Sequence, residues 1–140
     1  MAHRPLFIQW NERSETGIAL IDEQHKGIVS IINTFYYLMG LGWGSAMLYS
    51  CISDTMKNYS RTHFITEENF LEAIGYQDLE RHKALHSKLS IEIERIEYTA
   101  VRINEAGPLL DFLKKWWVNH INEEDRLYVQ YVRASGKKMR

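Results

Sequence analysis

The chain has 140 residues, of which 45% are hydrophobic and 25% charged, and its formal net charge at pH 7 is −1. This length suits one compact domain and is short for two, and the near-neutral charge excludes a strong electrostatic attraction to nucleic acid or an anionic membrane. No segment approaches the ~18 consecutive apolar residues of a membrane-spanning helix, and no leader is recognisable at the N-terminus. We therefore expect a cytoplasmic protein that binds neither nucleic acid nor membrane.

Glycine and proline divide the chain into an N-terminal arm and four long helical segments. We expect an irregular arm over residues 1–17, a helical domain over 18–135 and a basic tail over 136–140. The single cysteine, Cys51, excludes an internal disulfide and a thiolate metal site.

Apolar residues recur at spacings of three and four along each helical segment, which predicts helices that pack together in a bundle. The helices are expected over 18–39, 45–74 and 78–103, with a fourth starting at Pro108, a residue suited to a first helical turn. The inward stripe of the fourth is predicted to include Leu127 and Tyr131. Short connections make neighbouring helices antiparallel. The predicted fold is all-α: an up-down-up-down antiparallel four-helix bundle with an irregular N-terminal arm.

Histidines are unusually frequent on the inward stripes of these helices, together with one carboxylate. A buried polar group without a partner costs roughly 2–7 kcal/mol, so one such histidine is more often a hydrogen-bonded core residue, whereas a group of them indicates a bound ligand. His82 and His86 are four residues apart and share a helix face, and His63 and Glu67 have the same spacing, which suits metal chelation. The inward set comprises His25, His63, Glu67, His82, His86 and His120.

These side chains are expected to converge on one site, because their depths along an antiparallel bundle overlap when counted from the predicted helix ends. Imidazole and carboxylate ligands suit iron, and also manganese or zinc. A four-coordinate structural zinc site would not use so many.

Short motifs extend along nearly the whole chain, from Trp10 to Tyr131. They are WNE at 10–12, DEQH at 22–25, HFITEE at 63–68, GY at 75–76, HKALH at 82–86 and WVNHI at 117–121, followed by Asp125. Together they resemble the hemerythrin family, in particular its single-domain bacterial members, the bacteriohemerythrins.

The resemblance implies a non-haem di-iron centre with a solvent-derived oxo or hydroxo bridge. With the ligands it implies, one coordination position stays open on the iron that has two histidines, where a small molecule can bind. The implied ligands are His82, His86 and His120 on one iron, His25 and His63 on the other, and Glu67 and Asp125 between them.

The last of these ligands is ambiguous by spacing. His120 and Asp125 are five residues apart, which places them ~140° apart on a regular α-helix. Glu124, one turn after His120 and on the inward stripe, is the better partner by spacing alone. The resemblance selects Asp125, and the two agree if the helix widens locally into a π-type turn.

The resemblance further implies reversible oxygen binding, for storage or delivery to oxygen-consuming enzymes, without catalytic residues or an enzymatic activity. Two alternatives stay open at this point: an oxygen or redox sensor module, and a di-iron oxidase or nitric-oxide-reactive protein. No long exposed apolar stripe is evident, so we expect a monomer.

Overall fold

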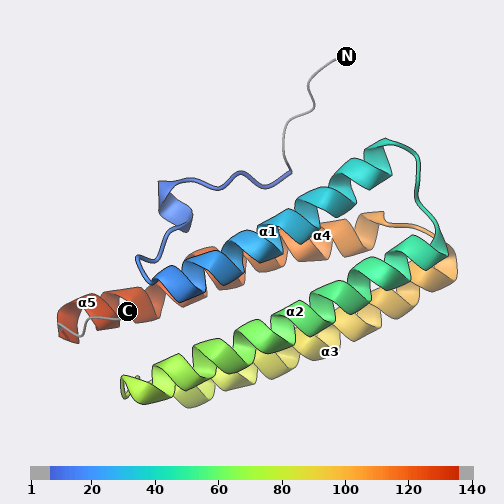
Figure 1. Ribbon diagram of the computed structural model, residues 1–140. Helices are drawn as coiled ribbons and strands as arrows, with labels where there is room; N and C mark the ends of the chain where they lie inside the picture. The colour runs from blue at the N-terminus through green and yellow to red at the C-terminus, as the bar shows by residue number, and fades with distance from the viewer. Residues whose placement is uncertain (1–6, 136–140) are drawn as a thin grey trace.

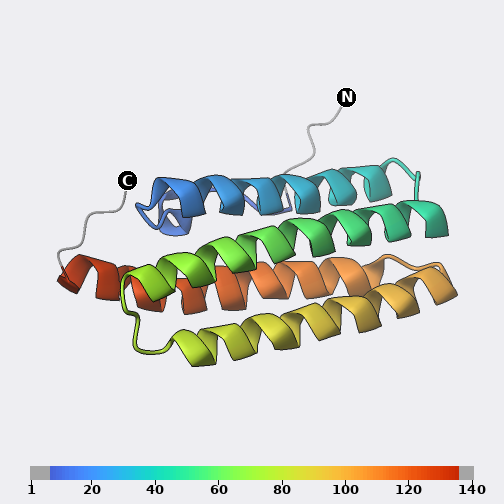
Figure 2. The same cartoon turned by 60° about the horizontal axis from the view of Figure 1, so that its bottom comes forward.

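The computed structural model describes residues 7–135, which form helices joined by short connections (Figure 1). Three helices are regular: α1 (Ala19–Gly40), α2 (Ala46–Ala73) and α3 (Leu79–Ile103). The fourth is continuous but has three parts: α4 (Gly107–Trp116), the π-helix η2 (Trp117–Glu124) and α5 (Asp125–Ser135). Successive helices lie side by side and run in opposite directions in both views (Figures 1 and 2), which confirms the predicted up-down-up-down bundle.

The helix ends follow from local chemistry, and each predicted end lies within one residue of the observed one. Ser45 precedes α2, and its side chain accepts a hydrogen bond from the amide of Leu48 at 3.1 Å, as a helix-capping serine does. Gly75 and Asn104 follow α2 and α3 with φ of 70° and 55°. These left-handed conformations, which glycine and asparagine tolerate best, turn the chain out of each helix.

The predicted domain boundaries stay a prediction. The basic tail, 136–140, lies outside the described residues, as do residues 1–6 of the arm. Among the helices that the structure describes, none combines the length and the apolar character needed to cross a membrane.

Two apolar clusters fill the bundle on either side of the histidines. On α1, His25 lies between Ile21 of one cluster and Ile28 of the other, and on α2, Glu67 lies between Phe70 and Phe64 in the same way. The polar side chains therefore interrupt one long core and divide it in two. The first cluster includes Ile28, Phe35, Met56, Phe64, Leu113 and Trp116, and the second includes Ile21, Phe70, Leu71, Tyr128 and Val129.

The N-terminal arm, which contains a short 3-10 turn (Glu12–Ser14), lies along the bundle beside α1 (Figure 1). The amide of Ile8 donates to Asn33 Oδ1, and Asn33 Nδ2 donates to the carbonyl of Ile8, both at 2.8 Å. Both residues are buried, so this pair satisfies polar groups that the core would otherwise leave without partners. Farther along the arm, the ring centroid of Trp10 lies 6.0 Å from that of Trp117.

Truncation of a core side chain in the first cluster tests this packing. Phe35 is fully buried and meets the edge of Tyr49, so Phe35→Ala is expected to lower the free energy of unfolding of the metal-free protein by about 3–5 kcal/mol. Trp43, which is 65% exposed, provides the control, because Trp43→Ala should change it by less than about 0.5 kcal/mol. Urea unfolding followed by circular dichroism measures both, and equal losses would contradict this account of the core.

Candidate metal centre

The structure brings all seven side chains singled out in the sequence into one buried cluster in the interior of the bundle. None is more than 4% exposed. The four helices of the bundle all contribute, so the cluster exists only when the whole bundle is assembled. His25 comes from α1, His63 and Glu67 from α2, His82 and His86 from α3, His120 from η2 and Asp125 from the start of α5.

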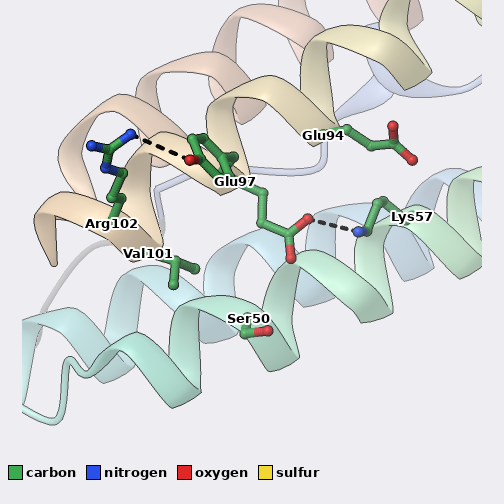
Figure 3. A pocket seen from close by; sticks show the side chains of 7 residues that line it. Ser50, Lys57, Glu94, Glu97, Val101 and Arg102 are labelled. Carbon is green, nitrogen blue, oxygen red and sulfur yellow. Dashed lines mark hydrogen bonds and ion pairs between the residues drawn. The ribbon is translucent and has the colours of Figure 1, made fainter.

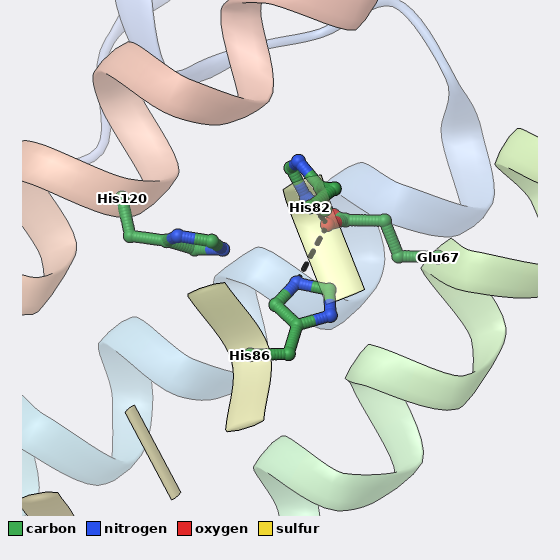
Figure 4. Close-up of side chains that lie close together, drawn as sticks. All are labelled: Glu67, His82, His86 and His120. Atoms are coloured by element: carbon green, nitrogen blue, oxygen red, sulfur yellow. Dashed lines mark hydrogen bonds and ion pairs between the residues drawn. The ribbon is translucent and has the colours of Figure 1, made fainter. Parts of the chain in front are cut away.

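The cluster divides into two groups, in each of which one potential ligand atom per residue lies within 4.8 Å of the others. Glu67 belongs to both groups, which makes it the link between them. One group, drawn in Figure 4, contains Glu67, His82, His86 and His120. The other contains His25, His63, Glu67 and Asp125.

Glu67 presents one carboxylate oxygen to each group of histidines. Its Oε1 lies 3.1 Å from Nε2 of His86 and also contacts Nε2 of His82. Its Oε2 lies 3.3 Å from Nε2 of His63, on the other side. A carboxylate with its oxygens divided in this way suits a bridge between two metal ions.

Asp125 repeats this two-sided arrangement. Its Oδ1 lies 3.2 Å from Nε2 of His82 and 3.5 Å from Nε2 of His120. Its Oδ2 lies 3.1 Å from Nε2 of His25. The five histidines thus face the two carboxylates in sets of three and two.

The π-helix explains why Asp125, and not Glu124, enters the cluster. The amide of Asp125 donates to the carbonyl of His120, five residues earlier, as in a π-helix. This widening confirms the local π-type turn that the sequence analysis required if His120 and Asp125, five residues apart, were to share one face. Glu124 lies outside, where its carboxylate accepts two hydrogen bonds from Arg81 at 2.9 and 3.1 Å.

The same widening corrects the prediction for the end of the fourth helix. Leu127, predicted on the inward stripe, is 45% exposed, whereas Tyr128 is fully buried. The prediction continued a regular α-helical spacing through residues 117–124, and the π-helix shifts the inward face beyond them. Tyr131 does pack against the second apolar cluster, as expected.

Tyr128 is a neighbour of the site that the sequence pattern did not reveal. Its hydroxyl donates to Glu67 Oε2 at 3.2 Å, so it helps to orient this carboxylate. Burial, with the nearby negative charge of Glu67, raises the pKa of Tyr128 well above its usual value, and the phenol therefore stays a donor. Its inward position follows from the π-helix, which changes the residues of α5 that face the core.

Gln24 and Glu68 were also missed as partners of the site, although both stand in the quoted motifs next to proposed ligands. Gln24 Oε1 lies 2.8 Å from Nδ1 of His63, and Glu68 Oε2 lies 2.8 Å from Nδ1 of His86. Sequence spacing places a histidine on a helix face, but it does not show what the second ring nitrogen contacts.

Several buried atoms of the cluster have no hydrogen-bond partner within residues 7–135. They are both ring nitrogens of His25, Nε2 of His63 and of His120, and both carboxylate oxygens of Asp125. Buried polar atoms are nearly always satisfied in proteins, so these unpaired lone pairs require a further group. Imidazole nitrogen and carboxylate oxygen are suitable ligands for iron, manganese and zinc, and the residues therefore fit a pair of bound metal ions.

The electrostatics of the metal-free cluster keep both carboxyl groups ionised. Burial alone would raise the pKa of Glu67, but the neighbouring His63 and His82 hold it well below its usual value. Asp125 also has a lowered pKa, because facing histidines outweigh burial and the charge of Glu67. Conversely, burial lowers the pKa of His82, but the adjacent carboxylates of Asp125 and Glu67 raise it to about 10. Metal binding must therefore displace a proton from this group.

A surface cavity of about 610 Å³ between α2 and α3 lies apart from this cluster (Figure 3). Within it, Lys57 donates to Glu97 at 2.6 Å and Arg102 donates to the hydroxyl of Tyr98 at 3.2 Å. None of its lining residues belongs to the histidine cluster, so the candidate centre is the buried group.

Comparison with known proteins gives consistent matches along the chain. The family model described as the hemerythrin HHE cation binding domain matches residues 16–132. A bacteriohemerythrin of Pseudomonas paraeruginosa is 34% identical over 99% of this chain and 88% of its own length. One from Clostridium acetobutylicum is 33% identical over 86% of this chain and 97% of its own length. A crystal structure of wild-type hemerythrin superimposes with a TM-score of 0.74 at 27% identity, covering 89% of this chain and 96% of that one.

The charge of His82 predicts how the stability of the metal-free protein depends on pH. Because its pKa rises from 6.5 to about 10 on folding, its contribution is fully present below pH 6.5 and is lost as pH rises through 10. We expect the free energy of unfolding, measured by urea denaturation, to decrease over this range. His82→Gln should remove much of the decrease, and an unchanged pH slope in this variant would contradict the assignment.

Proposed function

The chain belongs to the hemerythrin family, and on that basis we propose that it binds dioxygen reversibly at a non-haem di-iron centre. Such a protein stores oxygen or delivers it to oxygen-consuming enzymes. The proposed ligands are His82, His86 and His120 for one iron, His25 and His63 for the other, and Glu67 and Asp125 as bridges. The expected monomeric state and cytoplasmic location stay predictions.

The observation that carries this proposal is the two-sided placement of Glu67 and Asp125 between the two sets of histidines. When bound, a pair of ferrous ions would supply the two electrons on which reversible dioxygen binding draws. The set with His25 and His63 has one imidazole fewer than the other set. This side of the centre therefore leaves room for a small ligand.

Apolar side chains pack around the histidines of both sets. The ring of Trp117 meets that of His25 edge-on, with centroids 6.0 Å apart, and Phe64 lies 6.0 Å from His63. Ile121 is 2% exposed and belongs to the same apolar cluster. These groups exclude water, which limits proton delivery to a bound molecule and favours its release unchanged.

The balance of ligand types supports carriage over oxidation. Ferritin-like di-iron proteins draw a Glu from each of two helices and a Glu-x-x-His motif from the others. Here, five imidazoles accompany two carboxylates in the described cluster. A less anionic set of ligands stabilises oxidised metal less strongly, so return to the reduced state is easier.

Optical spectra of the reduced, iron-loaded protein test the proposed reversibility. The spectrum is recorded without oxygen, then in air, and then after oxygen removal. We expect charge-transfer bands that appear in air and disappear on deoxygenation. A single conversion to a stable ferric spectrum would reject the carrier and favour the oxidase or sensor alternative.

Replacing the carboxylate that ends the π-helix tests the ligand set. Asp125→Asn is expected to lose at least about 10-fold in iron affinity, since changes in the outer partners of metal ligands already cost that much. Glu124→Gln makes the same chemical change one residue away, where the carboxylate pairs with Arg81, and should keep the wild-type affinity. Anaerobic titration with a competing chelator measures both variants. Equal losses in the two, or none in Asp125→Asn, would reject Asp125 as a ligand.

A further inference from the structure

In two histidines of the centre, one from each set, Nδ1 contacts a side chain from another residue. One of these side chains is charged and the other is neutral. On the side with three histidines, Nδ1 of His86 lies 2.8 Å from a carboxylate oxygen of Glu68. On the side with two, Nδ1 of His63 lies 2.8 Å from the amide oxygen of Gln24. In both rings Nε2 faces Glu67. The two sets therefore differ in the group that accepts the hydrogen bond from Nδ1.

The hydrogen bonds fix which ring nitrogen carries the proton. Glu68 can only accept, so Nδ1 of His86 must donate. The amide of Gln24 is oriented by Thr66: Gln24 Nε2 donates to Thr66 Oγ1 at 3.2 Å, which leaves Oε1 to accept from His63. Because Nδ1 carries a proton in both rings, Nε2, which faces Glu67, is the nitrogen that a metal ion would bind after displacing any proton held there.

His86 is also held more firmly than a hydrogen bond alone would hold it. Phe64 stacks on its ring with centroids 4.0 Å apart and planes 10° apart. Phe64 and Glu68 are four residues apart on α2 and so share one helix face. One face of α2 thus fixes both the plane of the His86 ring and its protonated nitrogen.

We propose that this difference adds to the inequality that the unequal numbers of imidazoles give the two metal positions, with Glu68 as a positioning residue for the position held by His82, His86 and His120. A carboxylate that accepts the Nδ1 proton increases the electron density that Nε2 donates to a metal, and a neutral amide does so less. The position backed by Glu68 therefore fills first and retains its metal longer. This inference rests on the proposed di-metal function.

A charge exchange between the two acceptors tests the proposal. Glu68→Gln keeps an acceptor of nearly the same shape without the charge, and it should weaken the tighter of two stepwise binding constants by about 10- to 100-fold. Gln24→Glu should strengthen the weaker constant. The double variant, which keeps the total charge, should narrow or reverse the difference between them.

Glu72→Gln is the matched control, because Glu72 is exposed and lies one turn beyond Glu68 on α2. It should leave both constants unchanged. The titrations use ferrous iron added anaerobically to the metal-free full chain with a competing chelator. Nitrogen-15 spectra of the zinc-loaded protein provide a second readout, since the Nδ1–H signal of His86 should shift in Glu68→Gln but not in the control.

The outcomes separate this inference from the proposed function. If the wild type binds fewer than two metal ions, the di-iron function fails and this inference with it. If two ions bind and Glu68→Gln leaves the tighter constant and the His86 signal unchanged, or weakens both constants equally, the inference alone is overturned.

Discussion

Two carboxylates are buried among five imidazoles, and the rest of the structure is arranged around this constraint. Glu67 and Asp125 are fully buried, and an isolated charge in such surroundings would be prohibitively costly. The facing histidines lower the pKa of both acids, and these histidines come from all four helices. The apolar core is consequently divided in two, because buried histidines and carboxylates lie between its two parts. These polar groups are stabilised by contact with one another or with a metal ion.

Periodicity was sufficient to predict the fold and most of the site, but it failed where the helix changed its geometry. The spacing of His82 from His86 predicted a shared face, because both lie on a regular α-helix. Beyond His120 the same rule placed Leu127 inward, whereas the π-helix turns Tyr128 inward instead. The five-residue spacing from His120 to Asp125 indicates from the sequence that a π-type turn is needed. The sequence pattern does not show how that turn changes which of the following residues face inward.

The outer partners of the ligands could not be predicted for a different reason. Gln24 and Glu68 are polar residues beside proposed ligands, and many such residues simply face solvent. Their role depends on where the ring of a histidine from another helix is directed, which is a property of the packed bundle. The acceptor at the second nitrogen of each ring is thus decided by tertiary structure, whereas the inward placement of the histidines and Glu67 follows from helical spacing.

Part of the apolar covering of this site comes from the N-terminal arm and not from the helices of the bundle. Trp10 lies on Trp117, which meets His25, and the arm is held by Ile8 and Asn33 at a distance from every proposed ligand. The apolar covering of His25 therefore has an outer layer that belongs to no helix of the bundle. A substitution at Trp10 can therefore change how tightly the interior around His25 is sealed without altering the helices that carry the proposed ligands.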